Sequence, residues 1–405
     1  MSLSASERLI LHASLIDGVG ALTLRTIFER KSSSIEWTDL YRFSVNDFCE
    51  QFSVSPRISR LLVDGLADAK CLDEETELID RHHVKVLTCL SEFYPSSLST
   101  IVGPPAVLYY HGLLHCDQAL AIVGSRKAGS YAQQVLVSII PQLVLNNFTI
   151  VSGGARGADT MAHELALKAR GSTIAVLGSG LLEPYPWENK KLFESIVAAG
   201  GAVLSIFSLR TKALAGNFPA RNRIISGLSH GCLVVQAAQK SGARITAQYA
   251  LDQGREVFAI PGSIGDELSV GCHELIQQGA KLVTNANDIL IEFGFQRSTE
   301  MSPERVTPID NVPASQPHLE VGKKINHSGQ VREATQSLEK LLEDYAISDV
   351  VVGMKMLLQC QSAQYVDSLL EVNNIELVRA QQILFELMVA GLIDQDSAGR
   401  WVRLV

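Results

Sequence analysis

The sequence predicts an α/β protein built around a doubly wound (extended Rossmann-like) parallel-sheet domain, with an N-terminal all-helical domain and a C-terminal winged-helix domain. Short runs of Val, Ile and Leu alternate with helical segments between residues 120 and 293. Unbroken apolar strands separated by helices are typical of a parallel sheet that is covered on both faces. At 405 residues, the chain is long enough for two or three domains.

Changes in composition divide the chain into four parts. Residues 1–80 contain short helical patterns around the turn Gly18-Val19-Gly20, which predicts a helix-hairpin-helix-like (SAM-like) domain. Residues 81–296 hold the alternating strands and helices of the Rossmann-like domain. Residues 297–333 contain many Pro, Ser and Thr residues and lose apolar periodicity, so they predict a linker. Helical periodicity returns over 334–405 and ends in a hairpin pattern, which predicts the winged helix.

The chain has a net charge of −8, but this charge is unevenly distributed. Residues 81–297 hold 18 Lys and Arg against 14 Asp and Glu, whereas residues 1–80 hold 8 against 14 and residues 331–405 hold 6 against 11. The middle domain can therefore carry a local anion-binding face. The acidic ends favour a purely structural Gly18-Val19-Gly20 turn over one that grips a DNA phosphate. They also favour a winged helix that contacts protein over one that binds duplex DNA.

A glycine-rich turn, Gly153 to Asp159, follows the apolar run Phe148 to Val151 and precedes a helical segment. Unpartnered amides at a helix start favour an anion, and glycines let a phosphate approach the backbone closely. Arg156 adds a guanidinium within this turn. The alternative is a tight strand-to-helix connection that needs glycine only for its backbone conformation.

Two further arginine motifs follow predicted strands. The strand Leu120 to Val123 leads into Gly124-Ser125-Arg126, and the segment Asn217 to Ile225 carries two arginines and an amide beside an aromatic ring. Ligands of doubly wound sheets bind beyond the carboxyl ends of the strands. We therefore expect the three arginine motifs to lie together.

Other kinds of chemistry have little support in the sequence. The 7 cysteines are scattered without a C-x-x-C pair and the 10 histidines include no H-E-x-x-H pattern, so we expect no metal and no cofactor. Asp159 and His163 share a helix face without an accompanying nucleophile, which favours structural roles over acid–base catalysis. The sequence has no apolar run of membrane-spanning length and no signal-peptide layout, so a cytoplasmic location without membrane contact is expected.

Taken together, the motifs resemble the DNA-processing protein A (DprA/Smf) family. The matching segments are Ala121 to Arg126, Ser152 to His163, Val176 to Leu181, Tyr185-Pro186, Phe218 to Ser229, Ser241 to Ala247, Gly254 to Gly262 and Gly271 to Ile276. The resemblance implies a non-enzymatic homodimer that binds and protects single-stranded DNA. It also implies that the protein helps to load the recombinase RecA onto that DNA in natural transformation and homologous recombination.

The resemblance also implies which residues bind single-stranded DNA. They are Gly124, Ser125, Arg126, Ser130, Ser152, Gly153, Gly154, Ala155, Arg156, Gly157, Lys212, Phe218, Arg221, Asn222, Arg223, Ser241 and Arg244. Arginines and turn amides would hold phosphates, and Phe218 would stack on a base. Core packing of Phe218 and salt bridges at Arg221 and Arg223 are the structural alternatives. No residue is expected to be catalytic.

This chain departs from the family pattern at several positions. The family's usual lysine three residues before Phe218 is Ala215 here, so Lys212 is the nearest candidate for that phosphate contact. Ile206 and Gln236 stand where acidic residues are usual in the family. These differences indicate a divergent member that retains most of the site.

Two enzyme classes on related folds are weaker alternatives. A nucleoside-monophosphate phosphoribohydrolase would need a Pro-Gly-Gly-x-Gly-Thr-x-x-Glu motif, and the comparable stretch Pro261 to Glu267 lacks the second Gly and the Thr-x-x-Glu. An NAD-dependent oxidoreductase would need G-x-G-x-x-G, of which Gly178-Ser179-Gly180 is only a fragment. A nucleotide-binding hydrolase is therefore the alternative to DNA binding.

Overall fold

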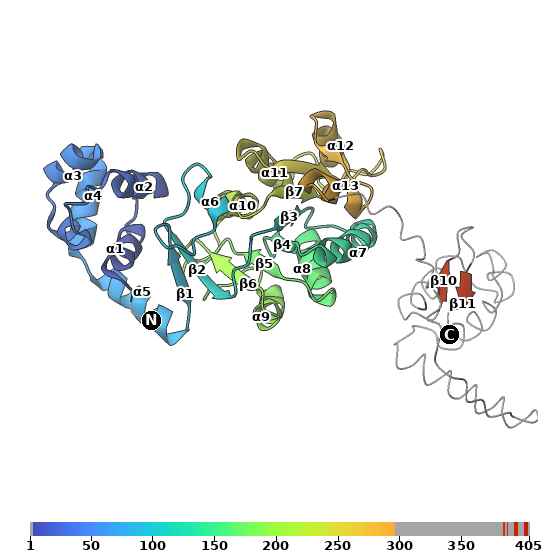
Figure 1. Ribbon diagram of the computed structural model, residues 1–405, viewed down its shortest axis with the longest axis horizontal. Coiled ribbons are helices and arrows are strands. Elements are labelled where there is room, and N and C mark those ends of the chain that lie inside the picture. The colour runs from blue at the N-terminus through green and yellow to red at the C-terminus, as the bar shows by residue number, and fades with distance from the viewer. Residues whose placement is uncertain (1–2, 296–383, 385–386, 388–392, 396–400, 404–405) are drawn as a thin grey trace, which may run out of the picture. The chain divides into compact units, whose positions relative to one another are not determined.

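The computed structural model describes residues 3–295, together with Leu384, Leu387, 393–395 and 401–403. Within residues 3–295 it forms a nine-stranded sheet in the order β1-β2-β6-β5-β4-β3-β7-β8-β9 (Figure 1). Neighbours from β6 to β9 in this order are parallel, whereas β2 runs antiparallel to β6 and β1 antiparallel to β2. The strands are β1 (Lys85–Thr88), β2 (Val107–Gly112), β3 (Ala119–Val123), β4 (Thr149–Ser152), β5 (Thr173–Val176), β6 (Ala202–Ser205), β7 (Gly231–Val234), β8 (Glu256–Ala259) and β9 (Lys281–Leu282).

The predicted doubly wound sheet is confirmed, and strand β3 shows how helices cover both of its faces. Leu120 and Ile122 lie in one buried cluster with residues of α7 and α8, whereas Ala121 and Val123 lie in another with residues of α10 and α11. Alternate residues of a strand point to opposite faces, so an all-apolar strand serves two cores at once. The helices after β1 are α6 (Ser96–Ser99), α7 (Ser130–Leu145), α8 (Ala158–Lys168), α9 (Lys190–Ala198), α10 (Asn217–Gly227), α11 (Gly242–Asp252), α12 (Val270–Gln277) and α13 (Ala286–Leu290).

The N-terminal region is helical. Its α-helices are α1 (Ala5–Ser14), α2 (Ala21–Arg30), α3 (Val45–Phe52), α4 (Pro56–Ala67) and α5 (Lys70–Arg81). The turn Gly18-Val19-Gly20 joins α1 to α2. Ser4 caps α1 and Ser44 caps α3, each in a capping box with an acidic residue three positions later.

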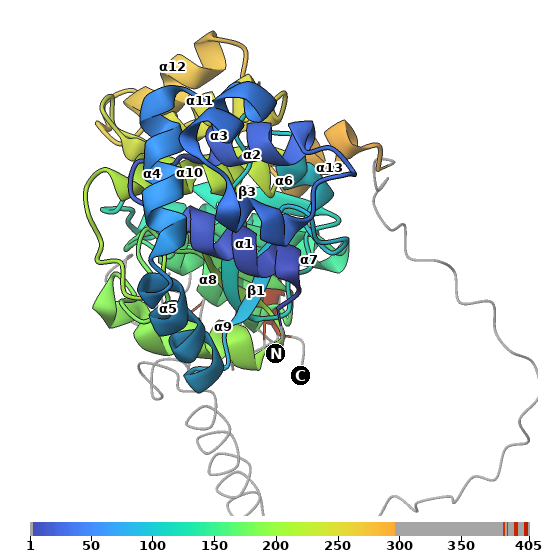
Figure 2. The ribbon, with the colours of Figure 1, turned by 90° about the vertical axis from the view of Figure 1, so that its left-hand side faces the viewer.

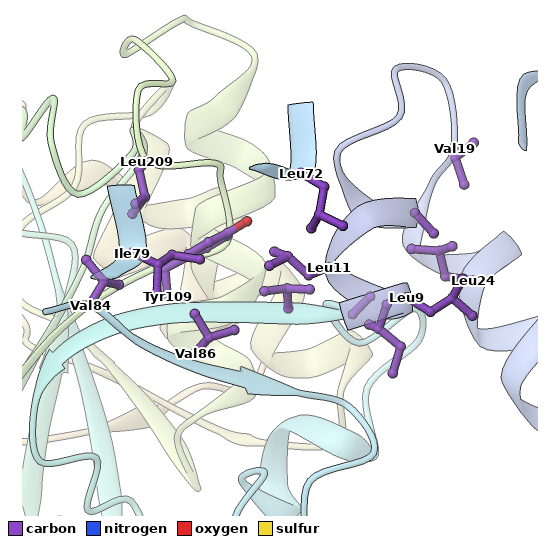
Figure 3. Close-up of a cluster of buried hydrophobic side chains, with 14 of the residues drawn as sticks. Leu9, Leu11, Val19, Leu24, Leu72, Ile79, Val84, Val86, Tyr109 and Leu209 are labelled. Carbon is purple, nitrogen blue, oxygen red and sulfur yellow. The ribbon is translucent and has the colours of Figure 1, made fainter. Parts of the chain in front are cut away.

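These N-terminal helices share a core with one edge of the sheet (Figure 3). Leu11 of α1 and Leu72 of α5 belong to the same buried cluster as Val86 of β1, Tyr109 of β2 and Leu209. Figure 2 shows α1 to α5 in front of the sheet. Helix α5 ends at Arg81 and β1 starts at Lys85, so the helical region continues into the sheet through a short turn.

A buried carboxylate also connects the helices to the sheet domain. Glu75 of α5 is 7% exposed and accepts a hydrogen bond of 2.8 Å from the backbone amide of Leu209. Burial raises the pKa of the Glu75 carboxyl, and the Leu209 amide partly opposes this shift. The contact fixes the chain just before the loop that leads into α10.

At the C-terminal end, β10 (Ile393–Gln395) and β11 (Trp401–Arg403) pair antiparallel. This pairing agrees with the predicted terminal hairpin. The predicted linker, 297–333, and the predicted helices of the winged-helix domain lie outside the described residues, apart from isolated positions.

We predict opposite effects of two substitutions at Glu75. Glu75→Ala leaves the buried Leu209 amide without an acceptor and should lower the free energy of unfolding by about 1–3 kcal/mol. Glu75→Gln keeps an acceptor oxygen and removes the buried charge. Folding raises the pKa of this carboxyl. Its contribution to the free energy of unfolding is therefore complete at pH values below its pKa in the unfolded chain, and it is lost as the pH rises through its pKa in the folded protein.

Glu75→Gln should therefore match or exceed the wild type in stability at pH 8 and lose this advantage near pH 4. Urea unfolding at both pH values measures the difference. Glu74→Ala, on the exposed side of the same helix, is the matched control. An equal loss of stability in the Gln and Ala variants at pH 8 would contradict the assignment.

Candidate nucleic-acid interface

A large open cavity lies at the carboxyl ends of the parallel strands. This main cavity has a volume of 1070 Å³ and is lined by the segments that follow β3, β7 and β8 and by the starts of α10 and α11. A smaller side cavity of 40 Å³ is lined by residues that follow β4 and β5. Arg126, Ala155, Phe218 and Arg221 line both cavities. The expectation that the arginine motifs meet at one sheet edge is correct for these residues.

Phe218 lies at the centre of a group of cations and aromatic rings. The guanidinium carbon of Arg126 is 5.4 Å from the centroid of the Phe218 ring, and that of Arg221 is 5.7 Å from it. The ring of Tyr185 meets Phe218 edge-on, with centroids 5.9 Å apart. Arg126 and Lys127 are exposed and line the main cavity, and within residues 3–295 neither forms an ion pair. The main cavity therefore presents two cations without an ion-pair partner beside a half-buried ring, and the carboxylates Asp266 and Glu267 line it as well.

Arg221 has a different role from Arg126. It is 4% exposed, and its Nη1 donates to the carbonyl of Val176 at 2.7 Å and to the carbonyl of Gly153. Burial lowers the pKa of the Arg221 guanidinium to about 10, and the nearby Asp159 carboxylate opposes this shift. These bonds join the carboxyl ends of β4 and β5. Part of the donor set that we expected to hold phosphates is thus used by the fold itself.

The glycine-rich turn is also occupied by the chain's own groups. The amides of Gly153 and Ala155 both donate to Oδ2 of Asp159, each at 3.2 Å. Burial raises the pKa of Asp159, and the charge of Arg221 opposes this shift. Gly157 has φ of +76°, and a Cβ there would lie 2.4 Å from the carbonyl oxygen of Ser125. The prediction of open amides is therefore wrong for Gly153 and Ala155, and the need for glycine at Gly157 comes from a close backbone contact.

Helix starts elsewhere in the main cavity can hold an anion instead. Ala215, Phe218 and Pro219 line the main cavity around the start of α10, and Ser241 and Gly242 line it at the start of α11. The partial positive charge of a helix N-terminus favours a phosphate. Two such ends beside Arg126 and Lys127 make this wall of the cavity suited to a nucleic-acid backbone.

The comparisons with known proteins agree with this architecture. The sequence model of the family DNA recombination-mediator protein A matches residues 85–294, more than half of the chain. The chain belongs to this family. Protein Smf of Escherichia coli (strain K12) is 47% identical over 217 residues, which cover 53% of this chain and 58% of that protein. The matched region therefore spans less than two thirds of that relative's length.

Relatives from Streptococcus pneumoniae match a larger share of their own length. The DNA processing protein DprA of that organism is 46% identical over 208 residues, which cover 51% of this chain and 73% of that protein. The X-ray structure of DprA from S. pneumoniae superimposes with a TM-score of 0.61 and 36% identity, covering 73% of this chain and 100% of that chain. This likeness supports the fold of the sheet domain.

The structure brings ten of the seventeen predicted DprA-type site residues to the two cavities. These residues are Gly124, Ser125, Arg126, Gly153, Ala155, Arg156, Phe218, Arg221, Asn222 and Ser241. The remaining seven, Ser130, Ser152, Gly154, Gly157, Lys212, Arg223 and Arg244, do not line either cavity. The prediction missed Lys127, Tyr185 and the loop Gly265 to Leu268, which also line them.

Several of the other predicted polar residues have partners within the chain. Arg244 forms an ion pair of 2.7 Å with Glu274, and Arg223 donates to the carbonyls of Val102 and Gly103 at 2.5 and 2.6 Å. The hydroxyl of Ser152 donates to the carbonyl of Ile122 at 2.6 Å. Arg156, at the side cavity, pairs with Glu188. The salt-bridge alternative considered for Arg223 is replaced by bonds to backbone carbonyls.

Of the two acid–base candidates, His163 lies inside the fold, whereas Asp159 lines the main cavity but is itself buried. His163 is fully buried, with Nδ1 2.7 Å from Oγ1 of Thr173, and burial lowers the pKa of its ring to about 3. Asp159, 6% exposed, is bound to the turn amides described above. Within the described residues there is no cluster of His, Cys, Asp and Glu suited to a metal ion. No helix of that part is both long and apolar enough to cross a membrane.

We predict that Asp159 stabilises the cavity rather than acting on a ligand. Asp159→Ala would leave the amides of Gly153 and Ala155 without their acceptor and Arg221 without its nearby carboxylate, so the free energy of unfolding should fall by about 3 kcal/mol. Asp159→Asn retains an acceptor oxygen and should cost less. Asp252→Ala, on the exposed surface of α11, is the control and should change stability by less than about 0.5 kcal/mol. Equal urea unfolding curves for Asp159→Ala and Asp252→Ala would refute this role.

Proposed function

We propose that this protein is a non-enzymatic single-stranded DNA-binding protein of homologous recombination and natural transformation. The observation that carries the proposal is the unpaired Arg126, 5.4 Å from the Phe218 ring at the edge of the main cavity. Arg126 and Lys127 would take backbone phosphates, together with the starts of α10 and α11. Phe218 would take the face of an unpaired base. Membership of a family of DNA recombination mediators supports the same proposal.

The arrangement favours a single strand over a duplex. Phe218 is partly enclosed by Arg126, Arg221 and Tyr185, so only a base that has left its stack can reach the ring. In a duplex both faces of each base are already covered. Phosphate contacts and ring stacking distinguish the four bases poorly, so binding should carry no sequence code.

The proposal that the protein is not an enzyme rests on the positions of its acidic and basic groups. Asp159 and His163 are buried and bonded within the fold. Asp266 lines the main cavity, but its carboxylate accepts bonds from the Leu268 amide at 3.0 Å and the Ser269 hydroxyl at 3.1 Å. Three carboxylates line the main cavity, and among the described residues Glu267 is the one without a hydrogen bond to the fold, so a phosphoribohydrolase reaction would have to use it.

We predict that Arg126→Ala weakens binding of a single-stranded oligonucleotide by about tenfold, because a charge-assisted contact is lost. The slope of log affinity against log salt should fall by about 0.7, the value for one phosphate on a single strand. Phe218→Ala should lower affinity by about 1–3 kcal/mol per lost stacked base, with little change in salt slope. Fluorescence anisotropy measures both quantities.

Arg244→Ala is the matched control, since Arg244 pairs with Glu274 and does not line either cavity. Its affinity should stay within about twofold of the wild type. Unchanged affinity in both Arg126→Ala and Phe218→Ala would remove this site from consideration. Release of free base from nucleoside monophosphates, lost in Glu267→Gln, would instead favour the hydrolase.

We further propose that the protein acts as a homodimer, protects single strands and helps to load RecA onto them. Family resemblance supports this proposal. Immobilised protein should retain RecA both with and without single-stranded DNA. Arg126→Ala should still retain RecA without DNA but should fail to speed filament assembly, because its DNA contact is weakened. If the immobilised protein retains RecA neither with nor without single-stranded DNA, the loading role is wrong. A monomeric mass by light scattering would overturn the proposed dimer.

A further inference from the structure

Two exposed aromatic residues follow β5 at the edge of the side cavity. Tyr185 is 44% exposed and lines the side cavity, and Trp187 is 66% exposed. A tryptophan this exposed leaves a large apolar ring surface accessible to a ligand. Tyr185 touches Phe218, so the aromatic surface continues outward from the proposed stacking residue.

The segment that carries Trp187 is held firmly against the glycine-rich turn. Asn189 donates from Nδ2 to the carbonyl of Gly154 at 2.9 Å and to Oγ1 of Thr160 at 2.8 Å. Glu188 pairs with Arg156 from the same turn. An aromatic ring on a fixed segment loses little conformational entropy when a base stacks on it.

Positive charge accompanies this aromatic surface. The ammonium of Lys190 lies 4.8 Å from the centroid of the Trp187 ring. Lys190 and Lys191 are both exposed and stand in the first turn of α9, where the helix dipole disfavours cations. Within residues 3–295 neither lysine forms an ion pair. Their position destabilises the free helix and suits an external polyanion.

Acidic residues line the main cavity on the side of β8, which lies away from β5 in the strand order. The loop that follows β8 contributes Asp266 and Glu267 to the cavity wall. A nucleic-acid backbone would be repelled from these carboxylates and attracted toward Lys190 and Lys191. The charges therefore favour an exit for the strand on the side of Tyr185 and Trp187.

We infer that Trp187 is a second stacking platform for single-stranded DNA, on which the strand continues after leaving Phe218 past Tyr185. Lys190 and Lys191 would hold the phosphates of this outer part. The inference rests on the proposed function of the main cavity, because the outer path begins at the ring of Phe218.

The test compares oligothymidylates of about 6 and about 20 nucleotides, one near the short end of the usual binding-site sizes and one beyond their long end. Trp187→Ala should lower the affinity for the longer oligonucleotide by about 5- to 100-fold and leave the shorter one nearly unchanged. Trp187→Phe, which keeps a ring, should restore most of the affinity. Phe93→Ala, at another highly exposed aromatic residue, is the matched control and should have no effect at either length. Binding of the longer oligonucleotide should also quench part of the tryptophan fluorescence of the wild type, and this quenching should be absent in Trp187→Phe.

The possible outcomes separate the two proposals. If the wild type binds both lengths and Trp187→Ala binds them equally well, the outer platform is wrong while the main site stands. Equal weakening at both lengths would also overturn it, since Trp187 would then act through the main cavity. If the wild type binds neither length, the proposed function itself fails.

Discussion

The edge of the sheet that carries the two cavities depends on one buried electrostatic arrangement. Asp159 accepts hydrogen bonds from the amides of Gly153 and Ala155, and Arg221 donates to the carbonyls of Gly153 and Val176. A buried carboxylate and a buried guanidinium are each costly alone, and each is tolerated here because the other lies near and because each also forms hydrogen bonds with backbone groups. The carboxyl ends of β4 and β5 are thereby fixed relative to α10, and the cavity has a rigid floor.

On this floor the functional groups fall into two sets. Arg221 and Asp159 are buried and bonded, so they define shape. Arg126, Lys127 and Phe218 are accessible and retain unused charge or ring surface, so they can meet a ligand. Arginines that line one cavity can thus have different roles, because burial decides whether a guanidinium binds the fold or is free to bind a ligand. The same reasoning separates Arg223, held by backbone carbonyls, from Arg126.

Much of the fold could be predicted from the sequence, because short apolar runs such as Leu120 to Val123 alternate with helical segments, which is typical of a parallel sheet buried on both faces. The antiparallel direction of β1 and β2 could not, since a strand's own residues do not encode its direction relative to a neighbour. The meeting of Arg126 and Phe218 followed from the rule that loops gather at carboxyl ends. The occupied amides could not be foreseen, because Asp159 fits equally well as a helix-start residue in solvent. Tyr185 belongs to a segment that resembles the family, but its contact with Phe218 could not be predicted, because the two residues lie far apart in the sequence.

The bond from Glu75 to Leu209 gives the N-terminal helices a share in the cavity. The chain leaves Leu209, passes Lys212 and Ala215, and enters α10 at Asn217, directly before Phe218. The helices therefore anchor one end of the segment that presents the ring. Removing these helices would expose the apolar side chains of Tyr109 and Leu209 to solvent and would break the hydrogen bond between Glu75 and the Leu209 amide. A ligand or partner that shifts α5 would displace Leu209 through its bond to Glu75. The loop after Leu209 would transmit this shift to Phe218 without involving the central strands of the sheet.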